Sequence, residues 1–487
     1  MCIQILTFCL SPINRNPSMF LSRISLALLA TSAIISPFAS AQGLRKSISS
    51  SEEVHIPTHN SFLSSLFGKS NNKNDRELSS TIHYNQMGID IEGQATDDSL
   101  GKSITISKDG LRVAVASPGA SSGKGIVQLF NWDATLEEWV QVGQDIVGPS
   151  MKVYLGWSMD MNDDGSRIVL GAPEAHNDDG CMRVYELDGN NTWQMLGGDI
   201  VPVMGTMGQA GVSVTINASG DRVAFGAPRT NNYAGRVAAF QLVNGQWEPL
   251  GQNIDGDVFN YYYHNYSGAS IAMDADGSRL VIGGRLGSES KGHVKIYDYD
   301  DDNSQWVLNI QIDGQDYYDR FGGDVDISED GNRIVVGAFT SDGASGSDSG
   351  QVCVFEYDGS NWNMIGQQIN GAAVKDRMGE SVVISGDGTH IAISSPENDE
   401  NGNNAGKIEV FKYSDASQSW ESQGTDIFGE CAGDKFGEGG GAIAMDRTGA
   451  HLAIGAQRGS YYAGMTRVYE SLAGAGDGTN GSTNICD

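Results

Sequence analysis

Short runs of alternating apolar and polar residues recur from residue 83 to residue 470, and glycine-containing turns separate them. Alternation with a period of two is typical of half-buried β-strands. The runs come in groups of four, and seven such groups follow one another along the chain. A glycine followed nine residues later by the glycine of a turn marks each group: Gly101/Gly110, Gly156/Gly165, Gly211/Gly220, Gly268/Gly277, Gly322/Gly331, Gly379/Gly388 and Gly440/Gly449. The chain is therefore predicted to be a repeat protein of seven four-stranded units.

The predicted strands of each unit have their own signatures. A tight turn such as Asp164-Gly165 joins the first strand to the second, which is a strong hairpin signal. The fourth strand opens on a tryptophan with a glycine four residues later, as in Trp193 and Gly197, but the copy at Trp306 lacks this glycine. A basic residue begins the second strand: Arg112, Arg167, Arg222, Arg279, Arg333, His390 and His451. Because these residues recur, we expect the tryptophans to pack the units and the basic residues to bond a neighbouring turn.

Four antiparallel strands per unit, repeated radially, predict an all-β fold, a seven-bladed β-propeller. No blade buries its faces alone, so stability requires a closed ring. The seventh unit stops after its third strand at Tyr469, and a lone copy of the fourth strand, Tyr84–Ile91, precedes the first unit. We expect this N-terminal strand to complete the last blade.

The two ends of the chain differ from the repeats. An apolar run over residues 24–35 follows Arg23 and precedes small residues, which is the order of a secretory signal peptide; we assign it to residues 1–41, with Met19 as an alternative start. Residues 42–82 are rich in Ser and Asn and predict a flexible leader, with a plastid-type transit segment as the alternative. Residues 471–487 predict a flexible tail. No apolar run reaches the about 18 residues that a membrane span needs, so we expect no membrane span. We expect the protein to be secreted and monomeric.

Four cysteines follow the predicted signal peptide. Cys431 falls in a loop and Cys486 in the tail, and they are the candidate disulfide. Cys181 and Cys353 fall on strands and are expected to be buried free thiols. In a secreted protein the Asn-x-Ser/Thr motifs are candidate glycosylation sites, at Asn190, Asn217, Asn265 and Asn480.

The charge of the chain narrows the class of partner. Its 31 basic and 61 acidic residues give a formal net charge of −30. A field of that sign repels phosphate backbones and anionic lipids, which argues against nucleic-acid and membrane-surface binding. None of the eight histidines lies in a metal-ligand spacing, and Gly-x-Ser-x-Gly is absent. We expect no cofactor, no bound metal and no catalytic residue.

The repeats resemble the FG-GAP repeat. Phe321-Gly322 and Phe436-Gly437, together with Gly171-Ala172-Pro173 in the second strand, carry the resemblance. It implies the seven-bladed propeller of integrin α-subunits and of secreted microbial proteins. The calcium-binding members have a longer acidic loop between the first two strands. Here the loop 274–279 is short and ends in an arginine, so we expect plain hairpin turns without that calcium site.

The longer loops of a propeller lie on one face, and long loops on a rigid scaffold commonly bind ligands. On this face the loops between blades combine tyrosine with charged residues, as protein and sugar-binding surfaces do. The candidate ligand-binding residues are Asp257, Tyr261, Tyr262, Tyr263, His264, Tyr317, Tyr318, Asp319, Arg320, Asp376 and Arg377. The alternative is that the tyrosines cap blade junctions and the charged residues form ion pairs at the rim.

Three functions remain open. The first is a secreted, non-enzymatic binding or adhesion module that recognises an extracellular protein or carbohydrate through the long-loop face. The second is an extracellular polysaccharide hydrolase or lyase that uses carboxylates in the central funnel. The third is an acidic coat or matrix component without a discrete site.

Overall fold

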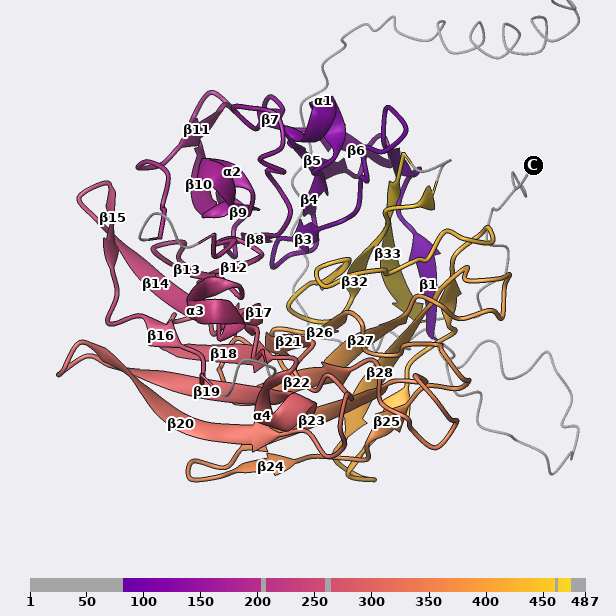
Figure 1. The fold of residues 1–487 in the computed structure, drawn as a ribbon. Helices are drawn as coiled ribbons and strands as arrows, with labels where there is room; N and C mark the ends of the chain where they lie inside the picture. Colours follow the sequence, from indigo (N-terminus) through magenta and orange to yellow (C-terminus); the bar gives the residue numbers. More distant parts are fainter. Residues whose placement is uncertain (1–81, 203–206, 259–263, 460–462, 474–487) are drawn as a thin grey trace, which may run out of the picture. The chain divides into compact units, whose positions relative to one another are not determined.

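The computed structural model describes residues 82–202, 207–258, 264–459 and 463–473. Seven antiparallel sheets follow one another around a ring, which confirms the predicted seven-bladed β-propeller (Figure 1). The predicted signal peptide, leader and tail lie outside the described residues and stay predictions. Among the described residues, no helix has the length and apolar character of a membrane span.

The first three blades follow the predicted repeats. Blade 1 contains β3 (Ile104–Ile106), β4 (Arg112–Ser117), β5 (Ile126–Asp133) and β6 (Glu138–Gln141), with β7 (Ile146–Val147) beside β5. Blade 2 contains β8 (Met159–Met161), β9 (Arg167–Ala172), β10 (Cys181–Leu187) and β11 (Trp193–Met195). Blade 3 contains β12 (Ser213–Ile216), β13 (Arg222–Gly226), β14 (Arg236–Val243) and β15 (Gln246–Pro249), with β16 (Ile254–Asp255) beside β14.

The next three blades continue in the same order. Blade 4 contains β17 (Ser267–Met273), β18 (Arg279–Gly284), β19 (His293–Asp300) and β20 (Gln305–Asp313). Blade 5 contains β21 (Asp324–Ile327), β22 (Arg333–Ala338), β23 (Gln351–Tyr357) and β24 (Trp362–Met364), with β25 (Ile369–Asn370) beside β23. Blade 6 contains β26 (Val382–Ile384), β27 (His390–Ser395), β28 (Lys407–Ser414) and β29 (Ser419–Ser422), with β30 (Ile427–Phe428) beside β28.

Blade 7 draws on both ends of the described chain. Its sheet has the order β1-β33-β32-β31, where β1 is Ile82–Gln86, β31 is Ile443–Met445, β32 is His451–Ala456 and β33 is Met465–Ala473. The antiparallel register sets Tyr84 opposite Ser471, and β2 (Ile91–Glu92) pairs with the start of β33. In Figure 1 the indigo β1 lies beside the yellow β33.

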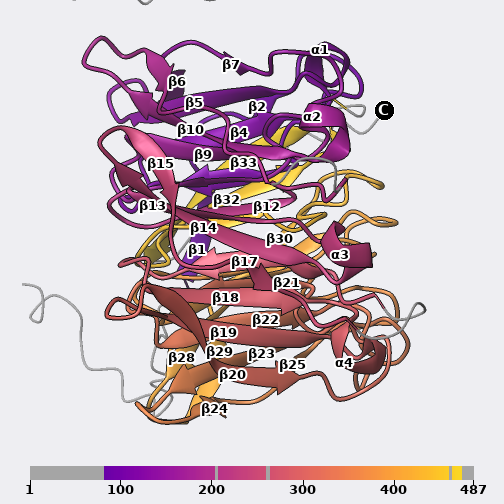
Figure 2. The ribbon, with the colours of Figure 1, turned by 60° about the vertical axis from the view of Figure 1, so that its left-hand side comes forward.

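Four short helical turns connect the second and third strands of blades 1 to 4. They are α1 (Ala120–Gly123), α2 (Ala175–Asp178), α3 (Thr230–Tyr233) and α4 (Gly287–Ser290). Figure 2 shows these turns along one face of the ring. This face is the predicted long-loop face.

The apolar core lies between neighbouring blades. One cluster packs Leu129 of blade 1 against Leu170 of blade 2, and another packs Val115 of blade 1 against Ala453 of blade 7. All four side chains are at most 1% exposed. Each blade therefore depends on its two neighbours for burial of its faces.

The tryptophan and glycine of the fourth strand interlock successive blades. A Cβ at Gly143 would lie 2.6 Å from Cδ1 of Trp193 in the next blade, so only glycine leaves room for that indole. The Trp193 indole N–H also donates to the Val142 carbonyl at 3.2 Å. The same contact recurs at Gly197/Trp247, Gly251/Trp306 and Gly366/Trp420. Ile310 of blade 4 stands where the glycine is missing, and the indole N–H of Trp362 in blade 5 has no partner among the described residues.

The arginine that begins the second strand bonds the next blade in blades 1 to 5, as predicted, whereas His390 and His451 form their hydrogen bonds within their own blades. Arg112 donates to the carbonyl of Gly165 at 2.7 Å, and Arg279 donates to that of Gly331 at 2.7 Å. Arg333 donates in the same way to Gly388 at 2.9 Å. These side chains are therefore structural links.

The start of the seventh repeat differs from the prediction. The backbone N–H of Gly437 donates to the Gly455 carbonyl, as Gly322 donates to Gly337 in blade 5. Gly437, and not the predicted Gly440, therefore occupies the repeat position. The interval to the turn glycine is longer in this blade because extra residues follow Gly437.

Candidate functional site

A cavity of about 670 Å³ opens on the long-loop face where the chain crosses from blade 4 to blade 5. It brings together five of the sequence-predicted residues, which are His264, Tyr317, Tyr318, Asp319 and Arg320. The loop after β18 and the loop after β22 supply its other walls. We call this cavity the crossing pocket.

The two tyrosines of the crossing pocket are exposed, Tyr317 by 60% and Tyr318 by 68%. The ammonium group of Lys291 lies 5.3 Å from the Tyr317 ring centroid, and the Thr340 hydroxyl donates to the Tyr318 carbonyl at 2.6 Å. Tyr318 has a φ of 70°, a left-handed conformation that costs a non-glycine residue about 1 kcal/mol. The loop holds two large aromatic side chains toward solvent.

His264 belongs to an aromatic cluster beside this pocket. Its ring centroid lies 4.6 Å from that of Tyr233 and 5.8 Å from that of Tyr266. The guanidinium of Arg285 lies 5.2 Å from the Tyr266 ring centroid. The cluster joins the α3 turn to the crossing between blades 3 and 4.

Other predicted residues serve local structure. Asp319 and Asp376 are only 6% and 3% exposed. Their carboxylates accept backbone N–H groups within their own loops, from Asp316 at 3.2 Å and from Ala373 at 2.9 Å. Both carboxylates therefore support the loops that contain them. The large exposed side chains of the crossing pocket are its two tyrosines.

Two more predicted residues, Asp257 and Arg377, do not line the pocket. Asp257 pairs with Lys295 at 2.6 Å, and Arg377 pairs with Glu397 at 3.3 Å. Tyr261, Tyr262 and Tyr263 lie outside the described residues.

The cysteines and sequons have different outcomes. Cys181 and Cys353 are buried free thiols, as predicted. Cys431 is disulfide-bonded, and because Cys486 lies outside the described residues their pairing stays a prediction. Asn217 and Asn265 are only 3% and 0% exposed, so neither side chain is accessible in the folded blades, and glycosylation there stays a prediction. Asn190 is exposed, and Asn480 lies outside the described residues.

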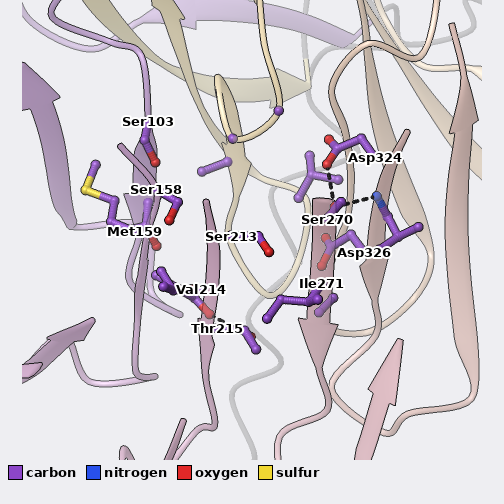
Figure 3. A pocket seen from close by; sticks show the side chains of 18 of the residues that line it. Ser103, Ser158, Met159, Ser213, Val214, Thr215, Ser270, Ile271, Asp324 and Asp326 are labelled. Atoms are coloured by element: carbon purple, nitrogen blue, oxygen red, sulfur yellow. Dashed lines mark hydrogen bonds between the residues drawn. The ribbon is translucent and has the colours of Figure 1, made fainter. Parts of the chain in front are cut away.

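A second cavity, of about 730 Å³, occupies the centre of the ring. The innermost strand of each blade contributes to its wall. Ser158 and Ser213 each donate to a glycine carbonyl of the next blade at 2.9 Å. Figure 3 shows Ser270 bonded both to Asp324 and to the backbone of β21. The polar wall of this central channel therefore links one blade to the next.

Two carboxylates of the channel have raised pKa values. Burial raises the pKa of Asp324 to about 6 and that of Asp326 to about 7, although backbone N–H groups partly offset it. Asp324 accepts the N–H of Val382 at 3.0 Å, and Asp326 accepts that of Ile384 at 2.8 Å. Both carboxylates thus tie β21 to β26, and burial holds both pKa values well above the ordinary value of an aspartate.

Two arginines and one phenylalanine at the mouth of the channel were not predicted from the sequence. Arg229, Arg285 and Phe339 line the central cavity where it meets the long-loop face. Arg285 and Phe339 come just after the second strand, at the position that holds proline in other blades, and Arg229 follows that proline in blade 3. That departure from the repeat was the signal in the sequence.

A left-handed residue recurs two positions before the first glycine of all seven blades. These residues have φ between 50° and 57°, and they are Ser99, Tyr154, Gln209, Tyr266, Arg320, Arg377 and Lys435. Non-glycine residues seldom adopt this conformation, and the strained backbone is often found at binding sites. Each blade thus presents a different side chain from the same left-handed backbone position.

One group of possible metal ligands also escaped the sequence reasoning. The ligand atoms of His176, Cys181 and Asp199 all lie within 4.8 Å of one another. Arg183 already donates to both oxygens of Asp199, at 2.6 and 2.8 Å. Burial raises the pKa of the Cys181 thiol to about 12, so the thiolate that a metal prefers is disfavoured. This group is an ion-pair network with a protonated thiol.

Comparisons with known proteins agree with the fold. Residues 312–355, from the end of β20 into β23, match the family model described as FG-GAP repeat. The structure is thus a seven-bladed β-propeller with an FG-GAP repeat, and the match contains Tyr317, Tyr318 and Arg320. No curated protein matches the chain significantly.

Many solved structures are similar to this chain, with 700 matching chains. One is the crystal structure of a candidate 6-phosphogluconolactonase from Bacteroides uniformis, at 14% sequence identity and a TM-score of 0.49. The similarity covers 70% of this chain and 88% of that chain. At this level it carries no conclusion about activity.

Proposed function

We propose that this protein is a secreted, non-enzymatic binding or adhesion module that recognises a protein or glycan partner through its long-loop face. The single observation that supports this most is the crossing pocket, where loops distant in sequence converge on two exposed tyrosines. Buried tyrosines would have supported a packing role instead. Exposed aromatic rings beside charged groups are typical of binding hot spots.

The two tyrosines can be tested directly. The full-length protein is screened against arrays of glycans and extracellular proteins, together with the double variant Tyr317→Ala/Tyr318→Ala. We expect the variant to lose at least about tenfold in affinity, since truncated hot-spot aromatics cost about 2 kcal/mol or more.

Leu136→Ala is the matched control, because Leu136 is 60% exposed but lies between β5 and β6, away from the pocket. If no array component binds, or if the double variant binds as the wild type does, this function is excluded for the crossing pocket.

Secretion is part of the proposal and needs its own measurement. We propose that the signal peptide is cleaved before Gln42, as the small residues preceding it suggest. Expression in a secreting host followed by N-terminal sequencing should give a mature chain that starts at Gln42. Retention of the protein inside the cell with its apolar segment intact would contradict it.

A polysaccharide hydrolase or lyase is the second candidate, because Asp326 has a pKa near 7. A carboxylic acid that is partly protonated at neutral pH can act as a general acid. Turnover of a polysaccharide panel that is abolished by Asp326→Asn, while the variant still folds, would favour the enzyme over the binding module.

A further inference from the structure

Three arginines lie where the central channel meets the long-loop face, and Arg285 among them has no acidic partner in the described part of the chain. Arg229 and Arg285 line the channel cavity, and Arg320 lines the adjoining crossing pocket. Within the described part of the chain, Arg285 interacts with Arg320, Arg229 and Tyr266 and with no acidic group, whereas Arg320 is attracted by Glu380 and Asp348 and repelled by Arg377. In a protein with a net charge of −30, three arginines grouped in one place are unusual.

Other cations of the same rim are neutralised. Lys435 lies 3.1 Å from both Glu397 and Glu438, and Arg458 lies 2.8 Å from Glu438. The rim of blades 6 and 7 is thus an internally paired network, whereas the charged groups that act on Arg285 of blade 4 are the cations Arg320 and Arg229. The difference identifies the surroundings of Arg285 as the part of the rim open to an anion.

Aromatic rings hold two of these arginines in place. The Arg285 guanidinium lies 5.2 Å from the Tyr266 ring centroid, and the Arg320 guanidinium lies 5.1 Å from the Phe339 ring centroid. A guanidinium that rests on a ring keeps its in-plane N–H groups free for two-pronged bonds to an oxyanion. The side chains are therefore ordered before any ligand arrives, which lowers the entropy cost of binding.

The three charges also oppose one another. Burial lowers the pKa of the Arg285 guanidinium, and the positive charges of Arg320 and Arg229 lower it further. Arg229 is exposed, whereas Arg285 and Arg320 are half-buried. A bound anion would relieve this repulsion in a partly desolvated site, where charge interactions are strong.

We propose that the mouth of the channel at blades 3 to 5 binds an acidic polysaccharide, with Arg285 at the centre of the site and Arg229 and Arg320 on either side. This proposal rests on the proposed binding function and names its ligand class. Several cations spread over three blades match a chain with repeated charges better than a single small anion. The neighbouring Tyr317 and Tyr318 provide exposed rings on which sugars can stack. Carboxylates of uronic acids and sulfate esters share the required oxyanion chemistry.

The test measures binding of the full-length protein to four probes: an oligogalacturonate, a sulfated galactan oligosaccharide, a neutral glucan of equal length and polyglutamate. We expect at least one acidic oligosaccharide to bind at least about tenfold more tightly than the glucan. The two acidic probes distinguish a carboxylate ligand from a sulfate ligand. Equal binding of the neutral glucan, or binding of polyglutamate alone, overturns the proposal.

The variants assign the binding to these arginines. Arg285→Ala should lose at least about tenfold in affinity for the acidic probe and Arg285→Lys should recover part of it, because a bidentate guanidinium contributes beyond its charge. Arg458→Ala is the matched control, since it removes a paired rim arginine, and it should bind as the wild type does. Should Arg285→Ala fail to fold, the exposed Arg229→Ala tests the same site. Unchanged binding in a folded Arg285 or Arg229 variant refutes the assignment.

The two proposals fail in different ways. If a neutral glycan or a protein binds through Tyr317 and Tyr318 while no acidic probe does, the ligand class is wrong and the binding module stands. If no probe and no array component binds, both proposals fail.

Discussion

Because His293 is uncharged in the folded protein, we predict that the free energy of unfolding falls at acid pH. This side chain begins β19, is 0% exposed, and neither ring nitrogen has a hydrogen-bond partner among the described residues. A Cβ at Gly287 would lie 2.0 Å from His293 Nδ1, so the ring is tightly enclosed. Burial, with a smaller effect of Lys295, lowers the pKa of His293 from 6.5 to about 4. The fold therefore holds the imidazole uncharged.

The sign of the pH dependence follows from this shift. Below a pH of 6.5 the unfolded chain takes up a proton on His293 that the folded chain does not. The free energy of unfolding is therefore intact above that pH and falls as the pH drops toward 4. Between about pH 7.5 and about pH 4.5 this one group should remove about 2.5 kcal/mol, which is a large part of the stability of an ordinary domain.

The assay is urea unfolding of the wild type and of His293→Gln at those two pH values, followed by tryptophan fluorescence. The variant loses packing at both pH values, but its stability should fall by about 2.5 kcal/mol less than that of the wild type on acidification. A direct proton NMR titration of the His293 ring should give a pKa well below 6.5.

His451 is the matched control because its shift has the opposite sign. The hydrogen bond with Asp446, at 2.9 Å, raises its pKa, so its stabilisation is present at low pH and lost as the pH rises through the raised value. His451→Gln should therefore weaken the fold more at acid than at neutral pH. Equal pH dependence of the wild type and His293→Gln would refute the reasoning on the buried imidazole.

Three further predictions concern the blades. Gly366→Ala should destabilise by about 1–3 kcal/mol more than Gly359→Ala in thermal unfolding, since both glycines have positive φ but only the first Cβ would meet the Trp420 ring; equal losses would contradict the interlock. The pKa of the Cys181 thiol is raised to about 12, so a thiol reagent should modify it only on unfolding, and rapid modification of the native protein would argue against this burial. Deleting residues 1–92 removes the strands that pair with β33 and should lower the melting temperature, whereas an unchanged melting curve would show that the ring does not need them.

The seven blades could be predicted from the sequence because each blade needs the same contacts with the next blade. Trp193 must fill the space over Gly143, and Arg112 must reach the turn at Gly165, so the same residue types recur at the same spacing. The seventh repeat was placed wrongly at Gly440 because an insertion separates Gly437 from its turn. Spacing alone does not tell which of several neighbouring glycines makes the conserved backbone bond.

The binding site could be predicted only in part. Tyr317 and Tyr318 were recognisable because their loop combines tyrosine with charged residues. Arg229 and Arg285 were not recognisable, since only the folded ring shows that they lie close to one another and to Arg320. The burial of Asn265 was likewise invisible, because a glycosylation motif is read from sequence and its accessibility is set by neighbouring blades.

The missing glycine at Ile310 has a consequence for how the ring responds to a partner. The outer edges of blades 4 and 5 lack the interlock found at other junctions, and the unpartnered indole N–H of Trp362 lies at this junction. The crossing pocket spans the same two blades on the long-loop face. Any molecule bound there would contact both blades across this junction, so binding should slow the solvent exchange of the Trp362 indole N–H.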